Sequence, residues 1–300
     1  MTGARPANRS PGAKPGTLRL ILKTARPKQW VKNAFVLAAL VFSGNVFNGD
    51  AELRIWAMVV AFCLASSATY LLNDAIDAPQ DRLNPRTANR PIARGDLERH
   101  TAFVAAAVLA VGALIISFLL NREAGAVIGG YIVLQLAYSF GLKHIAIVDI
   151  LAISLGFVLR ALGGLVAIPV ELSDWLLVCT GFLALLLGLG KRRGELVNVA
   201  PGAGRASIEG YTLPLVDQLI AITTAAIVVS YSIYAVIGSH ARYMALTIPF
   251  VVYGVFRLLQ IMQTKAETTE DPSTLVLRDR PLQACVVSWA VLAVILSAAQ

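Results

Sequence analysis

The chain has 300 residues, of which 57% are hydrophobic and only 15% are charged, and its formal net charge is +8. Soluble domains carry about 25% charged residues, and a mean hydropathy of +0.68 excludes this class. Only helices and closed barrels satisfy their backbone hydrogen bonds in lipid. The composition therefore predicts an all-α protein that crosses a membrane several times.

The first 25 residues have the composition of a disordered basic tail. Their stretch MTGARPANRSPGAKPG is rich in Pro, Gly and Ala and has no apolar core of a secretory signal peptide. We expect residues 1–25 to form this tail and residues 26–300 to form one transmembrane domain.

Nine apolar stretches are long enough to cross a bilayer, which takes roughly 20 residues. Their approximate ranges are 31–48, 53–72, 101–120, 124–141, 145–167, 174–190, 215–237, 243–262 and 282–299. The three cysteines lie inside these stretches without CxxC spacing, so neither a disulfide framework nor a zinc site is expected. The sequence predicts nine transmembrane helices in one bundle.

Basic residues are concentrated on one side of these nine helices. With a cytoplasmic N-terminus, the loops on that side hold 21 of the 26 Lys and Arg, whereas the opposite loops hold only Arg54, Arg122 and Arg242. Positive charge accumulates in short cytoplasmic loops, so we expect the N-terminus to be cytoplasmic. A basic face suits anionic lipid headgroups and phosphorylated substrates, and we expect no nucleic-acid partner.

The segment YLLNDAIDAPQDRLNPRTANRPIARG follows the second span and carries acids and arginines together. Asn73, Asp77 and Asp81 recur every four residues and therefore lie near one face of a helix. Asp74 lies close to the same face. Such oxygen ligands suit Mg²⁺, which takes one or two carboxylates together with substrate phosphates. The alternative is a solvated polar helix end, but clustered carboxylates repel one another unless cations neutralise them.

Four arginines follow the acids at four-residue spacing: Arg82, Arg86, Arg90 and Arg94. The guanidinium fork matches phosphate oxygens. The bias of positive charge toward the cytoplasm explains any one of them, but the cluster beside acids favours phosphate binding.

Three further basic stretches, RPKQWVKN, YSFGLKH and GLGKRRGEL, are expected on the same face. Each alone is equally consistent with a side chain that anchors a helix at the membrane surface. Together they indicate a polyphosphate site, and their candidate ligands are Lys28, Lys143, His144, Lys191 and Arg192.

Asp149 and Arg160 lie within the fifth predicted span, eleven residues apart and on roughly the same helix face. Ionisable residues at membrane depth usually face a cavity or pair with a partner. The two either form a structural salt bridge, or Asp149 faces the metal–diphosphate site while Arg160 binds a second anion deeper in the membrane.

The N-D-x-x-D-x-x-x-D run at residues 73–81 resembles the first signature of the UbiA superfamily of intramembrane prenyltransferases. Members typically carry a second D-x-x-x-D motif. The comparable stretch DILAI keeps Asp149 but has Ile153 where the second Asp would be, which disfavours ordinary prenyl transfer. The stretches RPKQWVKN, RPIARG, GKRRGEL and LRDRPLQ resemble one branch of the superfamily, the decaprenyl-phosphate phosphoribosyltransferases of the actinobacterial cell wall.

This resemblance implies a Mg²⁺-dependent enzyme that transfers phosphoribose from phosphoribosyl diphosphate (PRPP) to decaprenyl or another polyprenyl phosphate, with release of diphosphate. The product would lead to the lipid-linked arabinose donor for cell-wall arabinan. The enzyme would lie in the inner membrane of a bacterium, with its active site facing the cytoplasm; whether it forms a homo-oligomer is left open.

The implied roles divide the candidate residues into four groups. The metal ligands would be Asn73, Asp77 and Asp81. The catalytic acids would be Asp77, Asp81 and Asp149. The lipid phosphate would be held by Arg160. PRPP would be bound by Lys28, Asp74, Arg82, Arg90, Lys143, His144, Lys191 and Arg192.

Two other functions stay open on the sequence. One is an aromatic or haem-type prenyltransferase, in which the isoprenoid is the electrophile; a D-x-x-x-D motif at residues 149–153 would have favoured it. The other is a transporter of anionic lipids or metabolites, which would not need a Mg²⁺-binding pattern at a helix end. Release of diphosphate from PRPP in the presence of polyprenyl phosphate distinguishes the three.

Overall fold

The computed structural model describes residues 16–43, 45–85, 87–168, 174–198, 210–239, 243–264 and 279–298, and every regular element in these ranges is helical. Seven helical segments of the described chain are long and apolar enough to cross a membrane. They are built on α3 (Gly49–Asp81), α4 (Arg99–Leu120), α5 (Arg122–Phe140), α6 (Val148–Ala167), α9 (Leu213–Ile233), α10 (Ile248–Thr264) and α11 (Arg280–Ala298). The chain is therefore a multi-pass, all-helical membrane protein, as the composition predicted.

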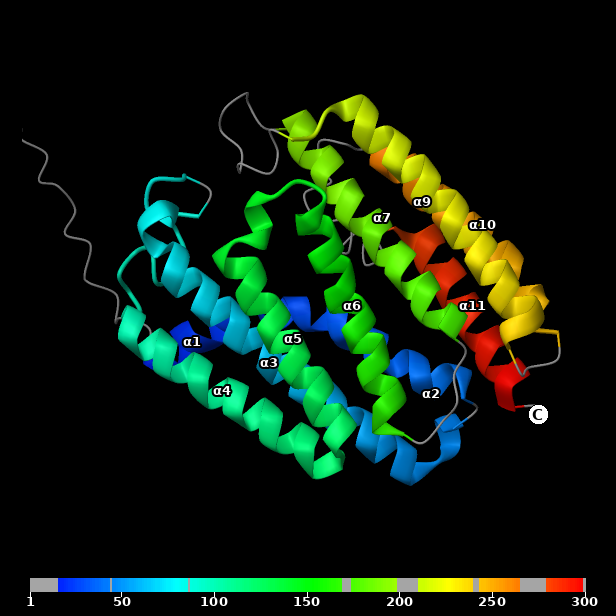
Figure 1. Cartoon of the computed structure of the whole chain (residues 1–300), viewed down its shortest axis with the longest axis horizontal. Coiled ribbons are helices and arrows are strands. Elements are labelled where there is room, and N and C mark those ends of the chain that lie inside the picture. Colours follow the sequence, from blue (N-terminus) through cyan, green and yellow to red (C-terminus); the bar gives the residue numbers. More distant parts are fainter. Residues whose placement is uncertain are drawn as a thin grey trace, which may run out of the picture.

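The helices form two groups that lie beside each other (Figure 1). One contains α3 to α6, and the other contains α9 to α11 together with α7 (Asp174–Asn198), which covers the sixth predicted span. Each group has its own apolar core, and α6 contributes to both cores. The last turn of α9 continues as a π-helix, η4 (Tyr234–Gly238), and η5 (Met244–Thr247) precedes α10.

The first predicted span is not one continuous helix. Its residues form the 3₁₀ helix η1 (Pro27–Leu37), the short helix α2 (Ala38–Phe42) and the 3₁₀ turn η2 (Asn45–Phe47). Runs of 3₁₀ helix longer than three or four residues are uncommon. Side-chain hydrogen bonds tie η1 to α3: Trp30 Nε1 donates to Ser67 Oγ at 3.1 Å and Asn33 Nδ2 donates to Cys63 Sγ at 3.2 Å.

The end of the expected N-terminal tail is helical. Residues Thr17–Ala25 form α1, which differs from the disordered tail expected there, and residues 1–15 lie outside the described ranges. Leu20 of α1 is buried against Leu71 and Ala75 at the end of α3. This tertiary packing stabilises a helix that is too short to be stable alone.

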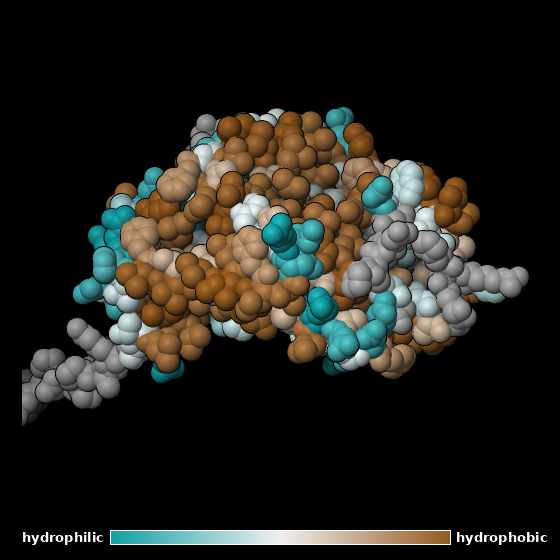
Figure 2. Space-filling model, turned by 60° about the horizontal axis from the view of Figure 1, so that its bottom comes forward, coloured by the Kyte–Doolittle hydropathy of each residue, from teal (hydrophilic) through white to brown (hydrophobic). Residues whose placement is uncertain are grey.

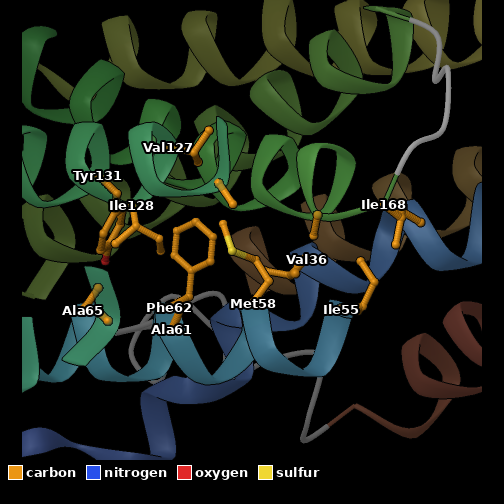
Figure 3. Packing of buried hydrophobic residues seen from close by; sticks show 14 of the residues in the cluster. Val36, Ile55, Met58, Ala61, Phe62, Ala65, Val127, Ile128, Tyr131 and Ile168 are labelled. Atoms are coloured by element: carbon orange, nitrogen blue, oxygen red, sulfur yellow. The ribbon is translucent and has the colours of Figure 1, made fainter. Parts of the chain in front are cut away.

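Close packing between α3, η1 and α6 depends on two adjacent glycines. A Cβ atom at Gly163 would lie 2.4 Å from the ring of Phe62, and one at Gly164 would lie 2.1 Å from the backbone oxygen of Val36. Small residues of this kind let membrane helices approach closely. Figure 3 shows Phe62 and Met58 of α3 pointing toward α5, where Tyr131 and Ile128 lie opposite them.

The outside of the bundle is apolar. Hydrophobic residues cover most of the face shown in Figure 2, and hydrophilic residues gather in separate patches. On α4, Val108 and Leu119 are largely exposed, with relative exposures of 66% and 81%. Lipid chains account for such exposure, because a soluble protein rarely exposes apolar patches of this extent.

Candidate active site

Each acid in the last two turns of α3 contacts a cation. The ammonium of Lys143 lies 2.9 Å from Oδ1 and 3.0 Å from Oδ2 of Asp77. Lys143 belongs to the 3₁₀ turn η3 (Leu142–His144), which connects α5 with α6. The turn therefore brings a buried lysine to the central acid of the predicted metal-binding run.

Arg90 connects the other two acids. Its Nη1 lies 3.0 Å from Oδ1 of Asp74 and 2.7 Å from Oδ2 of Asp81. The loop after α3 folds back against the helix, which brings Arg90 to these acids. A hydrogen bond within the loop stabilises this path: Arg82 Nε donates to the carbonyl oxygen of Ala93 at 3.0 Å. Arg90 was a predicted site residue, and the structure brings it together with Asp74 and Asp81.

Arg26 is a member of this cluster that the sequence analysis missed. Its Nη2 lies 2.6 Å from Oδ1 of Asp74, and its guanidinium stacks on the ring of Tyr70 at 5.0 Å. Arg26 ends α1 in the left-handed region, with φ of 53°, and the chain then enters η1 at Pro27. The only signal in the sequence was its position at the start of the RPKQWVKN stretch, which does not single it out from its basic neighbours.

The three acids and three cations of this site, here called the acid–base cluster, balance in charge. Its members are Asp74, Asp77, Asp81, Arg26, Arg90 and Lys143. Their side chains come from α3, the loop that follows it, the α1–η1 junction and η3. Opposite charges at these distances offset the cost of burying the carboxylates of Asp74 and Asp81.

The remaining candidates lie around the cluster or outside it. Asn73 is half-buried on α3, Lys191 is half-buried on α7, and Lys28 and His144 are exposed. Arg94 forms an exposed ion pair with Asp96 at 3.3 Å. Arg86 lies outside the described residues.

The carboxylates of α3 are of the chemical type that binds a divalent metal, although they are not arranged as a complete set of metal ligands. Among the described residues, no group of three or more His, Cys, Asp or Glu side chains is positioned to hold a metal ion. Mg²⁺ is usually held by one or two carboxylates together with substrate phosphates, so such a complete set is not required. Asp77 and Asp81, with the amide of Asn73 on the same helix, form a donor set of this type.

Asp149 contacts a different set of residues. Its Oδ2 lies 2.6 Å from Nη2 of Arg192, which also contacts Glu195, and its Oδ1 accepts a hydrogen bond of 2.7 Å from the hydroxyl of Tyr211. Asp149 and Arg192 are both buried, with relative exposures of 0% and 1%. The structural salt bridge considered for Asp149 and Arg160 is therefore wrong, because Arg192 is the cation that pairs with Asp149.

Arg160 lies apart from the acid–base cluster. Its guanidinium donates to Asn33 Oδ1, to the carbonyl oxygen of Gly156 and to the hydroxyl of Tyr131, each at 2.8 Å. It also stacks near the ring of Phe62, which precedes Asp77 by fifteen residues of α3, or about 22 Å at 1.5 Å per residue. The structure does not bring Arg160 to the predicted diphosphate site.

The sequence and the fold agree on the family. Residues 33–278 match the UbiA prenyltransferase family. The chain belongs to this family. Two curated relatives are both called decaprenyl-phosphate phosphoribosyltransferase. The protein from Mycolicibacterium smegmatis is 36% identical over 90% of this chain and 89% of its own length. The protein from Corynebacterium glutamicum is 36% identical over 90% of this chain and 84% of its own length.

The UbiA fold is also evident in three dimensions. A UbiA homologue from Archaeoglobus fulgidus, solved with GPP and Mg²⁺ bound, superposes with a TM-score of 0.73 over 94% of this chain and 100% of its own. Its sequence is only 14% identical, so this likeness concerns the fold alone. The UbiA-family assignment confirms the resemblance that the N-D-x-x-D-x-x-x-D run suggested.

Proposed function

We propose that this UbiA-family protein transfers phosphoribose from PRPP to a polyprenyl phosphate and releases diphosphate. The observation that carries the proposal is the shared name of the relatives that align with 90% of the chain. The acid–base cluster supports it, because the cluster offers both carboxylates for a metal and cations for phosphate oxygens. Decaprenyl phosphate is the proposed lipid acceptor, and the product is a lipid-linked phosphoribose.

Asn73, Asp77 and Asp81 would hold Mg²⁺ in this reaction. When bound, the ion neutralises charge on the diphosphate and so improves it as a leaving group. These three residues would thereby hold the diphosphate at the end of α3. On α6, Ile153 stands where the D-x-x-x-D motif would carry its second acid.

The cations of the cluster would bind the diphosphate of PRPP. Lys143, Arg90 and Arg26 already lie within 3.0 Å of carboxylate oxygens. A diphosphate at this position gives them new anionic partners, and charge-assisted contacts of this kind stabilise the developing charge of the leaving group. The outer candidates on the same side are Lys28, Arg82, His144 and Lys191.

The lipid phosphate would be the nucleophile. A phosphate monoester is already anionic near neutral pH, so no strong general base is required. Catalysis is then mainly positioning: the attacking oxygen and the anomeric carbon must come within about 3–3.5 Å in line with the leaving diphosphate. The lipid phosphate must therefore reach the end of α3 for transfer, and Arg160 lies too deep to hold it there.

The site is proposed to face the cytoplasm of a bacterial inner membrane. With the nine passes and cytoplasmic N-terminus predicted from the sequence, the ends of α3 and α5 and the start of α6 would lie on the strongly basic side. PRPP is a soluble phosphate ester and would enter from there, while the polyprenyl chain stays in the bilayer.

Radiolabelled PRPP tests the function directly. Purified protein reconstituted with Mg²⁺ and decaprenyl phosphate should transfer label into the lipid fraction and release one diphosphate per labelled lipid. Asp77→Asn, which removes one charge and keeps the side-chain shape, should lower this rate about 10²-fold or more. Transfer of a prenyl group from an allylic diphosphate to 4-hydroxybenzoate, without labelling from PRPP, would contradict the proposal.

A further inference from the structure

The connection between η3 and α6 contains a strained turn at Ile147. Its φ is 69° and its ψ is −48°, and the amide of Val148 donates to the carbonyl oxygen of Ala146 at 2.8 Å. These values describe a γ-turn of the rare type with positive φ. A β-branched residue in this region is an outlier, because its side chain clashes with the backbone. The turn persists only if surrounding contacts hold it.

Tyr211 supplies these contacts from a distant part of the chain. Its hydroxyl accepts the amide hydrogen of Ile147 at 2.6 Å and donates to Oδ1 of Asp149 at 2.7 Å. The backbone amide of Ile150 donates to the same oxygen at 2.8 Å. Burial raises the pKa of Tyr211, so the hydroxyl keeps the proton that it donates.

Arg192 completes the arrangement on the other carboxylate oxygen of Asp149. Its Nη2 lies 2.6 Å from Oδ2, and neither side chain is accessible to solvent beyond 1%. Inside the bundle, Oδ1 of Asp149 thus accepts two hydrogen bonds and Oδ2 forms an ion pair with Arg192. The contacts join the start of α6 to the end of α7 and to the residues just before α9.

Lys143 lies four residues before the strained turn. The direction of the chain through Ile147 therefore decides where η3, and with it the ammonium of Lys143, meets Asp77. The ammonium of Lys143 lies 2.9 and 3.0 Å from the two carboxylate oxygens of Asp77, so a shift of η3 by about 1 Å would take both contacts beyond hydrogen-bond distance.

We propose that Tyr211, Asp149 and Arg192 form a clamp that holds the γ-turn and so positions Lys143 at the diphosphate site. The inference rests on the proposed function, since the role of Lys143 is to bind the diphosphate of PRPP. It makes Tyr211 a positioning residue that acts through Lys143, and it explains why Asp149 and Arg192 are buried against each other. The clamp residues do not touch PRPP.

Tyr211→Phe removes the hydroxyl and keeps the ring. The amides of Ile147–Ile150 should then exchange with deuterium faster than in the wild type, and kcat/KM for PRPP should fall about ten-fold or more, as for the loss of a hydrogen bond to a charged group. In a Lys143→Ala background, Tyr211→Phe should cause no further fall, because the clamp acts through that lysine.

Tyr231→Phe is the matched control. Its hydroxyl is also buried, accepts from Trp289 Nε1 at 2.8 Å and contacts Thr247 Oγ1 at 2.7 Å, but it lies at the far end of α9. This variant should leave exchange at Ile147–Ile150 and kcat/KM for PRPP unchanged.

Three results would overturn the inference: unchanged exchange in Tyr211→Phe, equal effects of the two Tyr→Phe changes, or a full additional loss in the Lys143→Ala background. Failure of the proposed function has a different signature, because the wild type itself would then form no labelled lipid while the exchange comparison still responds to the clamp.

Discussion

Lys143 and Asp77 are sixty-six residues apart in the chain, and the lysine ammonium lies within hydrogen-bond distance of both carboxylate oxygens. The acid predicted to be the central metal ligand is therefore paired with a lysine. A metal ion that binds Asp77 would compete with this ammonium for the carboxylate and weaken the ion pair. A diphosphate that arrives with the metal supplies the ammonium with another anion.

Binding of Mg²⁺ and diphosphate should therefore be coupled. We expect Mg²⁺ alone to bind weakly and its affinity to rise about ten-fold or more when diphosphate is present, within the usual range of coupling free energies. Isothermal titration of the reconstituted protein with Mg²⁺, with and without diphosphate, measures the coupling. Lys143→Met should strengthen binding of Mg²⁺ alone and reduce the coupling; unchanged Mg²⁺ affinity in this variant would refute the competition between lysine and metal.

Arg90 and Arg94 provide a matched pair of substitutions in one loop. Arg90 contacts Asp74 and Asp81 within the cluster, whereas Arg94 forms a solvent-exposed pair with Asp96. Arg90→Gln should lower kcat/KM for PRPP about 10²-fold, because it removes a partly buried cation from between two acids. Arg94→Gln should change it by less than about two-fold, as exposed ion pairs contribute little. Steady-state kinetics with varied PRPP give both values, and similar losses in both variants would argue against a special role for Arg90.

The sequence predicted the parts of this fold that depend on local pattern. The length of the apolar stretches predicted the helices from α3 onward, and the four-residue spacing of Asn73, Asp77 and Asp81 predicted that they share one helix face. It did not predict that η1 is a 3₁₀ helix or that α1 is helical, since both are fixed by packing on α3.

Tertiary pairing in the site was even less accessible to sequence reasoning. Spacing suggested that Asp149 pairs with Arg160, but Arg192 contacts Asp149 from another helix and Tyr211 reaches it across sixty-two residues. In the sequence, Arg26 does not differ from the other basic residues near the N-terminus, and only the fold brings it into an ion pair with Asp74. No periodicity within one segment encodes such contacts.

Gly164 should tolerate no larger side chain. Its ideal Cβ would lie 2.1 Å from the backbone oxygen of Val36, and backbone cannot move aside as a flexible side chain can. Gly164→Ala should destabilise the protein by about 1–3 kcal/mol, the usual cost of overpacking. Gly130→Ala on α5 is the control, since nothing lies within 4 Å of its Cβ position, and it should be neutral or slightly stabilising. Thermal unfolding in detergent compares the two, and equal melting temperatures would exclude the close approach of α6 to η1.

The membrane orientation can be tested with single cysteines at exposed positions. In a variant with Cys63, Cys179 and Cys285 replaced by Ala, Asn89→Cys lies in the basic loop after α3 and Asp50→Cys lies at the opposite end of that helix. An impermeant maleimide added to intact cells should label position 50, and position 89 should react only in inverted vesicles, because basic loops stay in the cytoplasm. The reverse pattern would place the acid–base cluster outside the cytoplasm and remove its access to PRPP.

A substitution of Arg160 can distinguish two roles for this residue: it either binds the lipid phosphate or holds the helices of the bundle together. Its three hydrogen bonds join η1, α5 and α6, and the rings of Tyr131 and Phe157 stack on it at 4.8 and 5.2 Å. Removal of the guanidinium leaves Asn33 and Tyr131 as buried polar groups without this partner, each of which costs about 1–3 kcal/mol. Arg160→Ala should therefore lower the melting temperature and reduce kcat/KM for PRPP and for polyprenyl phosphate by similar factors. A selective rise in KM for the lipid, with an unchanged melting temperature, would instead show that the lipid phosphate reaches this depth and binds Arg160.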